Sequence, residues 1–84
     1  MTIDEATALR LAGEAVDRAG GSRHIYRNPR HPFAPNAIRS FEIEGYRVVV
    51  RFGEISSPAI VEVEGWVFEI QEEGLITLFR PSRE

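Results

Sequence analysis

One five-residue pattern occurs twice in this sequence, and it restricts the fold more than any other feature. The segment EIEGY at 42–46 is matched by EVEGW at 62–66. In both copies, apolar and charged residues alternate around an acidic residue that is followed by glycine. Alternation with a period of two is typical of a strand with one buried face, and an acid-glycine pair is typical of a two-residue hairpin turn. The pattern therefore predicts two β-hairpins.

The turns also predict how the strands pair. A turn at Glu44-Gly45 sets apolar residues opposite apolar ones and joins opposite charges: Ile43 with Tyr46, Phe41 with Val48, and Glu42 with Arg47. By the same rule, the second hairpin pairs Val63 with Trp66 and Val61 with Phe68. A third turn at 72–74, interpreted as a three-residue loop, would bring Ile76 opposite Ile70 and Leu78 opposite Phe68. We therefore expect five strands near 38–44, 46–53, 59–64, 66–71 and 75–79.

A helix is expected at the N-terminus, over residues 3–19. Thr2 and Glu5 have the spacing of a capping box, and Gly20-Gly21 supplies a C-terminal stop. Its inward face would use the small or apolar residues Leu9, Ala12, Gly13 and Val16.

The 84 residues then form one α+β domain, 1–84, with the helix packed on a four- to five-stranded antiparallel meander sheet over 38–79. A Pro/Arg-rich loop over 20–37 connects the two parts. Ser22–Arg27 is a candidate for a further short strand within that connection.

The expected sheet has more apolar surface than the expected helix can hide. Five strands span about 24 Å, whereas one helix is about 10 Å across. The remaining area would be covered by the Pro-rich loop, by curvature of the sheet or by another molecule. The expected inner face consists of Phe41, Ile43, Tyr46, Val48, Val50, Phe52, Val61, Val63, Trp66, Phe68, Ile70, Ile76 and Leu78.

The opposite face of the sheet is also partly apolar. Val49, Ile60, Val67 and Phe79 alternate with acidic residues and arginines on that face. Such a stripe with charged flanks is a candidate docking surface, although scattered aliphatic residues on a surface are normal.

No acidic residue occurs between Asp17 and Glu42, and this segment carries five arginines together with His24 and His31. Tyr26, Arg27, Arg30 and Phe33 would allow it to stack on unpaired bases and to neutralise phosphates. The overall sequence pI of about 5.4 counts against a nucleic-acid partner. The arginines would otherwise pair with carboxylates of this chain or of a second copy.

Catalytic and metal-binding patterns are weak. The chain has no cysteine, and the seven-residue spacing of His24 and His31 matches no familiar metal signature. We expect no enzyme activity and no cofactor. Neither a signal peptide nor a membrane span is visible, and the absence of cysteine favours a cytoplasmic protein.

These features together predict a small non-catalytic module that binds protein, either a second copy of itself or another chain, as a homodimer, an adaptor or an inhibitor. The expected contact residues are aromatic, aliphatic and arginine side chains on the loop and the sheet: Tyr26, Arg27, Arg30, Phe33, Val49, Ile60, Trp66, Val67 and Phe79. The alternative is binding of single-stranded nucleic acid or an anionic ligand by the acid-free segment 18–41.

Overall fold

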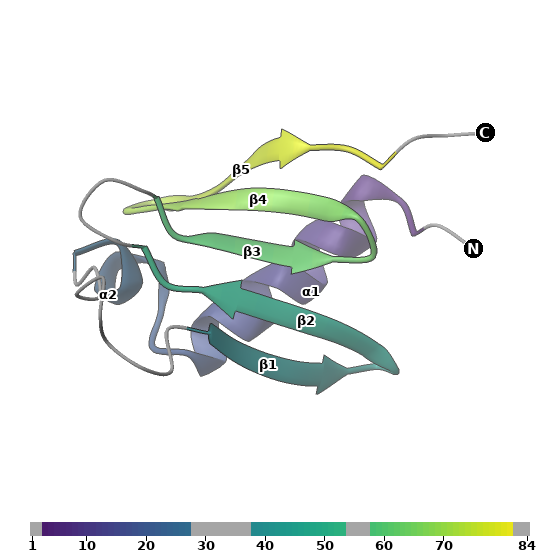
Figure 1. Cartoon of the computed structure of the whole chain (residues 1–84), viewed down its shortest axis with the longest axis horizontal. Helices are drawn as coiled ribbons and strands as arrows, with labels where there is room; N and C mark the ends of the chain where they lie inside the picture. Colours follow the sequence, from purple (N-terminus) through teal and green to yellow (C-terminus); the bar gives the residue numbers. More distant parts are fainter. Residues whose placement is uncertain (1–2, 28–37, 54–57, 82–84) are drawn as a thin grey trace.

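The computed structural model describes residues 3–27, 38–53 and 58–81. Two helices precede five strands: α1 (Glu5–Arg18), α2 (Ser22–Arg27), β1 (Ile38–Ile43), β2 (Tyr46–Arg51), β3 (Ile60–Val63), β4 (Trp66–Gln71) and β5 (Gly74–Phe79). The strands form one antiparallel sheet in chain order, and α1 crosses one of its faces (Figure 1). This arrangement confirms the α+β fold with an N-terminal helix on a five-stranded meander.

The first two hairpins have the expected register. Ile43 pairs with Tyr46 in the first, and Val63 pairs with Trp66 in the second. Both residues of each turn adopt positive φ angles, 54° and 84° at Glu44-Gly45 and 49° and 88° at Glu64-Gly65. Two left-handed residues in succession match the right-handed twist of the flanking strands, which explains why an acid-glycine pair closes each hairpin.

The two turn glycines differ in one respect, and this difference makes a matched stability test. A Cβ atom at Gly65 would lie 3.0 Å from the Cβ of Pro81, whereas a Cβ at Gly45 would meet nothing within 4 Å. We expect Gly45→Ala to cost about 1 kcal/mol through its positive φ, and Gly65→Ala to cost about 1–3 kcal/mol more through overpacking. Urea unfolding followed by circular dichroism measures both. Equal losses would show that Pro81 moves aside freely.

The third hairpin differs from the expectation by one residue. Gln71 pairs with Gly74, so the turn consists of Glu72 and Glu73 alone. Leu75 rather than Ile76 therefore lies opposite Ile70. Because successive side chains of a strand point to opposite faces, this shift moves Ile76 out of the inner face.

A bulge follows in the same strand. Phe68 pairs with Thr77 and Val67 pairs with Phe79, which leaves Leu78 as an extra residue. The assignment of Ile76 and Leu78 to the core is therefore wrong, and their side chains are 53% and 52% exposed.

Helix α1 also begins later than the capping-box pattern predicted. Its N-cap is Asp4, whose carboxylate accepts a hydrogen bond of 2.8 Å from the backbone N–H of Thr7. Hydrogen bonding from Thr7, chiefly by its side chain and also by its backbone N–H, keeps the pKa of the Asp4 carboxyl below its ordinary value. Glu5 does not cap the helix, because its carboxylate accepts hydrogen bonds from the Thr77 hydroxyl and the Arg80 guanidinium of β5 and its extension. Thr2 lies outside the described residues.

The buried face of α1 is rotated from the expected one. Its fully buried members are Ala8, Leu11, Ala12, Ala15 and Val16, whereas Leu9 is 41% exposed. The small side chains let α1 lie close to the sheet. The expectation of Leu9 and Gly13 on the inner face is wrong, because two overlapping apolar stripes occur on this helix and packing against the sheet selects one.

The segment Ser22–Arg27 forms helix α2 and not a strand. Ile25 is its buried residue, with 1% of its surface exposed. Helix α2 contacts β4 and β5, while α1 contacts all five strands. Seven apolar residues of the inner face are consequently at most 3% exposed: Ile43, Val48, Val50, Val61, Val63, Phe68 and Ile70. The expected shortage of cover on this face is therefore wrong, because two helices share it.

Candidate protein-interaction surface

The outer face of the sheet, opposite α1, is the main candidate surface (Figure 1). The strand register arranges it in rows that run across the strands. Val49 lies opposite Glu62, Glu62 opposite Val67, and Val67 opposite Phe79. In the next row, Arg51, Ile60, Glu69 and Ile76 follow one another in the same way.

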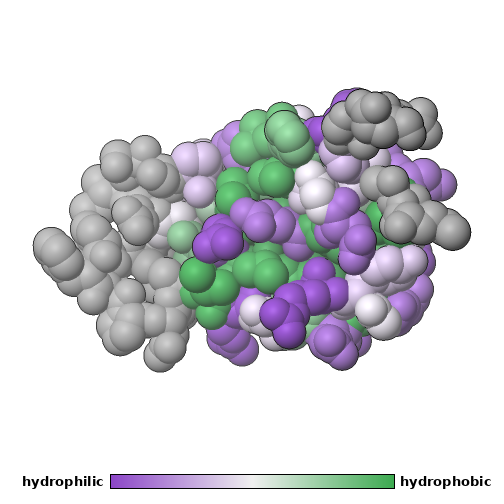
Figure 2. Space-filling model, turned by 45° about the vertical axis from the view of Figure 1, so that its right-hand side comes forward, coloured by the Kyte–Doolittle hydropathy of each residue, from purple (hydrophilic) through white to green (hydrophobic). Residues whose placement is uncertain are grey.

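Within each row, from β1 to β4, apolar residues alternate with polar or charged ones, and the two rows are offset by one strand. An apolar residue on one strand is therefore the diagonal neighbour of an apolar residue on the next strand, within reach of it. Together they form a zigzag across all five strands, which we call the outer stripe: Ile38, Val49, Ile60, Val67, Ile76 and Phe79. Figure 2 shows apolar surface interleaved with hydrophilic surface on this part of the molecule.

Exposure along the outer stripe increases toward both edges of the sheet. Its three middle members on β2, β3 and β4 are half-buried. Ile38 on β1 is 49% exposed, and Phe79 on β5 is 59% exposed. The largest accessible apolar side chains therefore stand at the two ends of the stripe.

The charges between the apolar residues are partly neutralised within the face. The Arg51 guanidinium lies 3.0 Å from a carboxylate oxygen of Glu62, and Gln71 donates to Glu69. A charge that keeps its partner loses less on desolvation than an isolated one. These contacts make the outer face easier to cover with another protein than its composition suggests.

The basic segment is engaged with the chain's own carboxylates where the structure describes it. Arg23 and Arg27 of α2 both pair with Glu72 in the β4–β5 turn, and Arg18 lies 2.7 Å from Glu14 one helical turn away. Arg39 stacks over Phe41, with its guanidinium 5.9 Å from the ring centre. Arg30 and Phe33, both expected contact residues, lie outside the described residues.

A bidentate ion pair joins helix α1 to the β1–β2 turn. Arg10 of α1 donates two hydrogen bonds, of 2.6 and 3.0 Å, to the Glu44 carboxylate in the β1–β2 turn. These bonds lower the pKa of Glu44, and the hydrogen bond from Thr77, aided by Arg80, lowers the pKa of Glu5. Among the described residues, the three carboxylates with lowered pKa values are Asp4, Glu5 and Glu44, and all three help to fasten α1.

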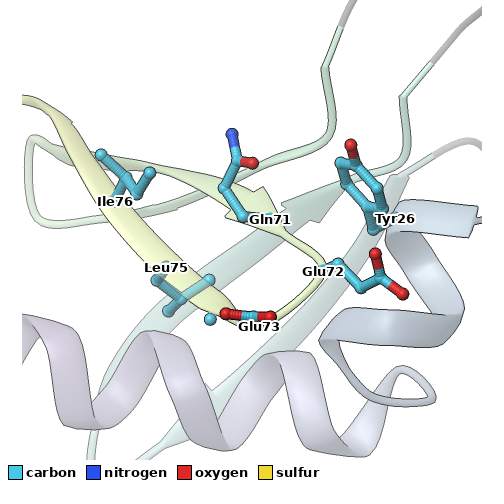
Figure 3. A pocket seen from close by; sticks show the side chains of 7 residues that line it. Tyr26, Gln71, Glu72, Glu73, Leu75 and Ile76 are labelled. Carbon is cyan, nitrogen blue, oxygen red and sulfur yellow. The ribbon is translucent and has the colours of Figure 1, made fainter.

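A shallow hollow lies where α2 meets the β4–β5 turn. Its volume is about 470 Å³, and Tyr26 forms one side of it while Gln71 and residues 72–76 form the other (Figure 3). Tyr26 is 48% exposed. Two of the lining side chains, Tyr26 and Gln71, rise on the same side of the β4–β5 hairpin in Figure 3.

Trp66 has a different place from the other expected contact residues. It is only 7% exposed on the inner face, and its indole N–H donates to the carbonyl of Ile3 at 3.0 Å. The guanidinium of Arg80 lies 5.8 Å from its ring centre. This placement makes Trp66 a core residue that fixes the N-terminal segment, and it does not support a role as an exposed anchor.

The structure thus brings Val49, Ile60, Val67 and Phe79 together on one face and separates them from Tyr26 and Arg27 at the end of the sheet. Two members of the outer stripe, Ile38 and Ile76, were missed by the sequence reasoning. Ile38 could have been found from its alternation with Ser40 and Glu42, while Ile76 required the correct turn length.

Within residues 3–27, 38–53 and 58–81, no group of three or more histidine or acidic side chains is arranged to hold a metal ion. The same residues include no helix long and apolar enough to cross a membrane. Comparisons with protein-family models, with curated proteins and with solved structures find no match.

Proposed function

We propose that this chain is a small, non-catalytic, cytoplasmic module that binds protein through the outer face of its sheet. The observation that carries this proposal is the outer stripe, an apolar zigzag that extends over all five strands and is most exposed at its two ends. An apolar centre with charged flanks is the usual anatomy of a protein interface.

The arrangement of the charges supports a binding role. The described arginines at 18, 23 and 27 have carboxylate partners in the same chain. A partner that attached mainly through these guanidinium groups would have to displace those carboxylates. Burial of the outer stripe requires no such exchange, and its flanking ion pair of Arg51 and Glu62 can persist in a complex.

The proposal predicts that one charged substitution in the middle of the stripe abolishes partner binding. Ile60→Lys places an ammonium group in the stripe between Arg51 on β2 and Glu69 on β4. Because Arg51 already pairs with Glu62, the Glu69 carboxylate can balance the added charge and the sheet keeps its fold. Loss of a central contact of this kind typically weakens binding by about 30-fold or more. The measurement is capture of partners from nuclease-treated extract of the source cells at low and high salt, followed by a titration of the purified partner.

Leu9→Lys is the matched control, because Leu9 is an exposed apolar residue on α1 and far from the outer face. It should bind as the unmodified chain does, and apolar contacts should persist when the salt concentration is raised. Equal binding by the Ile60→Lys variant would contradict the proposal. A partner that is lost after nuclease treatment and stripped by salt would instead favour the alternative, nucleic-acid binding by segment 18–41.

A further inference from the structure

The two edge strands of the sheet differ in a way that bears on self-association. β1 carries the charged residues Arg39 and Glu42, whereas β5 has neither a charged residue nor a proline between Gly74 and Phe79. Edge strands usually carry such residues because they prevent pairing with another chain. β5 therefore lacks protection by charge or by proline, and its bulge at Leu78 lies beyond residues 74–77, whose pairing with β4 is regular.

The hydrogen-bond pattern shows which backbone groups β5 offers. The N–H of Ile70 donates to the carbonyl of Ala59 at 2.9 Å, so this residue of β4 faces β3. Backbone groups of an antiparallel strand alternate in direction, so Glu69 and Gln71 face β5 and bond to their partners there, Ile76 and Gly74. In β5, the backbone N–H and C=O groups of Gly74 and Ile76 therefore face β4, whereas those of Leu75 and Thr77 point away from the sheet. Among the described residues, no strand pairs with them.

We propose that a second copy of this chain pairs with β5 in an antiparallel arrangement, with the twofold axis beside Ile76. Leu75 of each copy then forms a hydrogen-bonded pair with Thr77 of the other, and the two Ile76 residues lie opposite each other. The result is one continuous ten-stranded sheet. Since the axis is perpendicular to the sheet, the outer stripes of the two copies lie on the same side and meet at Ile76.

Charge selects the antiparallel orientation. β5 is preceded by the acidic pair Glu72-Glu73 and followed by Arg80. Antiparallel pairing brings the acidic turn of each copy beside Arg80 of the other, whereas parallel pairing would set like charges together. Glu73 and Arg80 are both exposed. Arg80 also pairs with Glu5 of its own chain at 3.0 Å, so its guanidinium would be shared between Glu5 and the acidic turn of the second copy.

The hollow at the β4–β5 turn suits the same arrangement. Glu73 precedes Ile76 by three residues, and Phe79 follows it by three with the bulge at Leu78 between, so the pairing carries Phe79 of the second copy into the region of Glu73 and toward the hollow beside Tyr26. Phe79 is the most exposed large apolar residue of the described chain. The contact would cover it and the Tyr26 ring together.

A single cysteine tests the register directly, because the natural chain has none. Opposed residues in a non-hydrogen-bonded pair have Cα atoms about 4.5 Å apart, within the range of about 4.4–6.8 Å that a disulfide spans. Under mild oxidation at micromolar concentration, Ile76→Cys should convert mostly to a covalent dimer. Ser40→Cys, at a site on the other edge strand that is also exposed, should remain mostly monomeric. Equal cross-linking of the two variants, or none at Ile76→Cys, would overturn the proposal.

Light-scattering mass over a dilution series is the second measurement. The unmodified chain should have the mass of a dimer, and Ile76→Lys, which sets two ammonium groups across the axis, should have the mass of a monomer. The proposed dimer would be contradicted if the unmodified chain were monomeric, or if Ile76→Lys left a dimer intact. The two proposals share Ile76 and Phe79, but the dimer depends on the backbone edge of β5 and partner binding depends on the middle of the outer stripe, so each can fail alone. Ile60→Lys should keep the dimer while it loses the partner.

Discussion

Replacement of Phe68 by alanine is expected to remove a large share of the free energy of unfolding of this protein. Phe68 is the largest fully buried side chain of the described residues, and it lies in β4 opposite Val61 on one side and Thr77 on the other. Its ring is parallel to that of Trp66, with the ring centres 6.2 Å apart. Truncation of a buried phenylalanine costs about 3–5 kcal/mol, and a domain of this length has a stability of only about 4–13 kcal/mol. The free energy of unfolding from urea titration measures the loss.

Phe79→Ala provides the matched control for this experiment, since it removes the same ring from a position that is 59% exposed. Measured at a concentration low enough to keep the chain monomeric, it should change the free energy of unfolding by about 0.5 kcal/mol or less. Similar losses for the two variants would mean that Phe68 is not at the centre of the core.

The contrast between these phenylalanines illustrates what the sequence could predict. The registers of the first two hairpins follow from local chemistry, because Glu44-Gly45 and Glu64-Gly65 favour two left-handed residues and thereby fix every pair along the strands. The alternation then assigns each side chain to a face. For this reason the sequence alone places Val49, Ile60 and Val67 correctly on the outer face.

The third hairpin lacks such a constraint. Glu72-Glu73-Gly74 is compatible with a turn of two or of three residues, and both neighbours that follow, Leu75 and Ile76, are apolar. Neither the turn nor the hydrophobic pattern distinguishes the two registers. The error exchanged the faces of β5, which hid the exposed Ile76 and with it the character of this edge.

The buried face of α1 and the conformation of α2 could not be predicted, because both depend on tertiary contacts that the sequence does not show. In α1, Leu9 and Leu11 each head an apolar stripe, and only packing on the sheet decides which one is buried. Helix α2 has six residues, too few to be stable in isolation, so its conformation depends on β4 and β5. The coverage of the inner face could not be estimated without α2, which is why that face seemed too large for the helix.

The dependence of α2 on the sheet leads to a second large effect. Ile25→Ala is expected to cost about 2–5 kcal/mol, because Ile25 is the buried residue of α2 and is 1% exposed. Loss of its side chain should release α2 from β4 and β5 and break the ion pair of Arg27 with Glu72. Urea unfolding measures the overall loss, and hydrogen exchange of the α2 amides measures the local release.

Tyr26→Ala separates docking of the helix from a general effect of shortening a side chain. Tyr26 is adjacent to Ile25 but 48% exposed, so its truncation should cost less than about 1 kcal/mol and leave the exchange of the α2 amides unchanged. If both variants lost little stability and kept slow exchange in α2, then contacts other than Ile25 would hold this helix. Faster hydrogen exchange of the α2 amides in Ile25→Ala alone, at conditions where the protein is still folded, would show that the Ile25 side chain holds α2 on the sheet. Ile25 would then also hold Tyr26 in place as one wall of the hollow. The hollow would then be lost together with it.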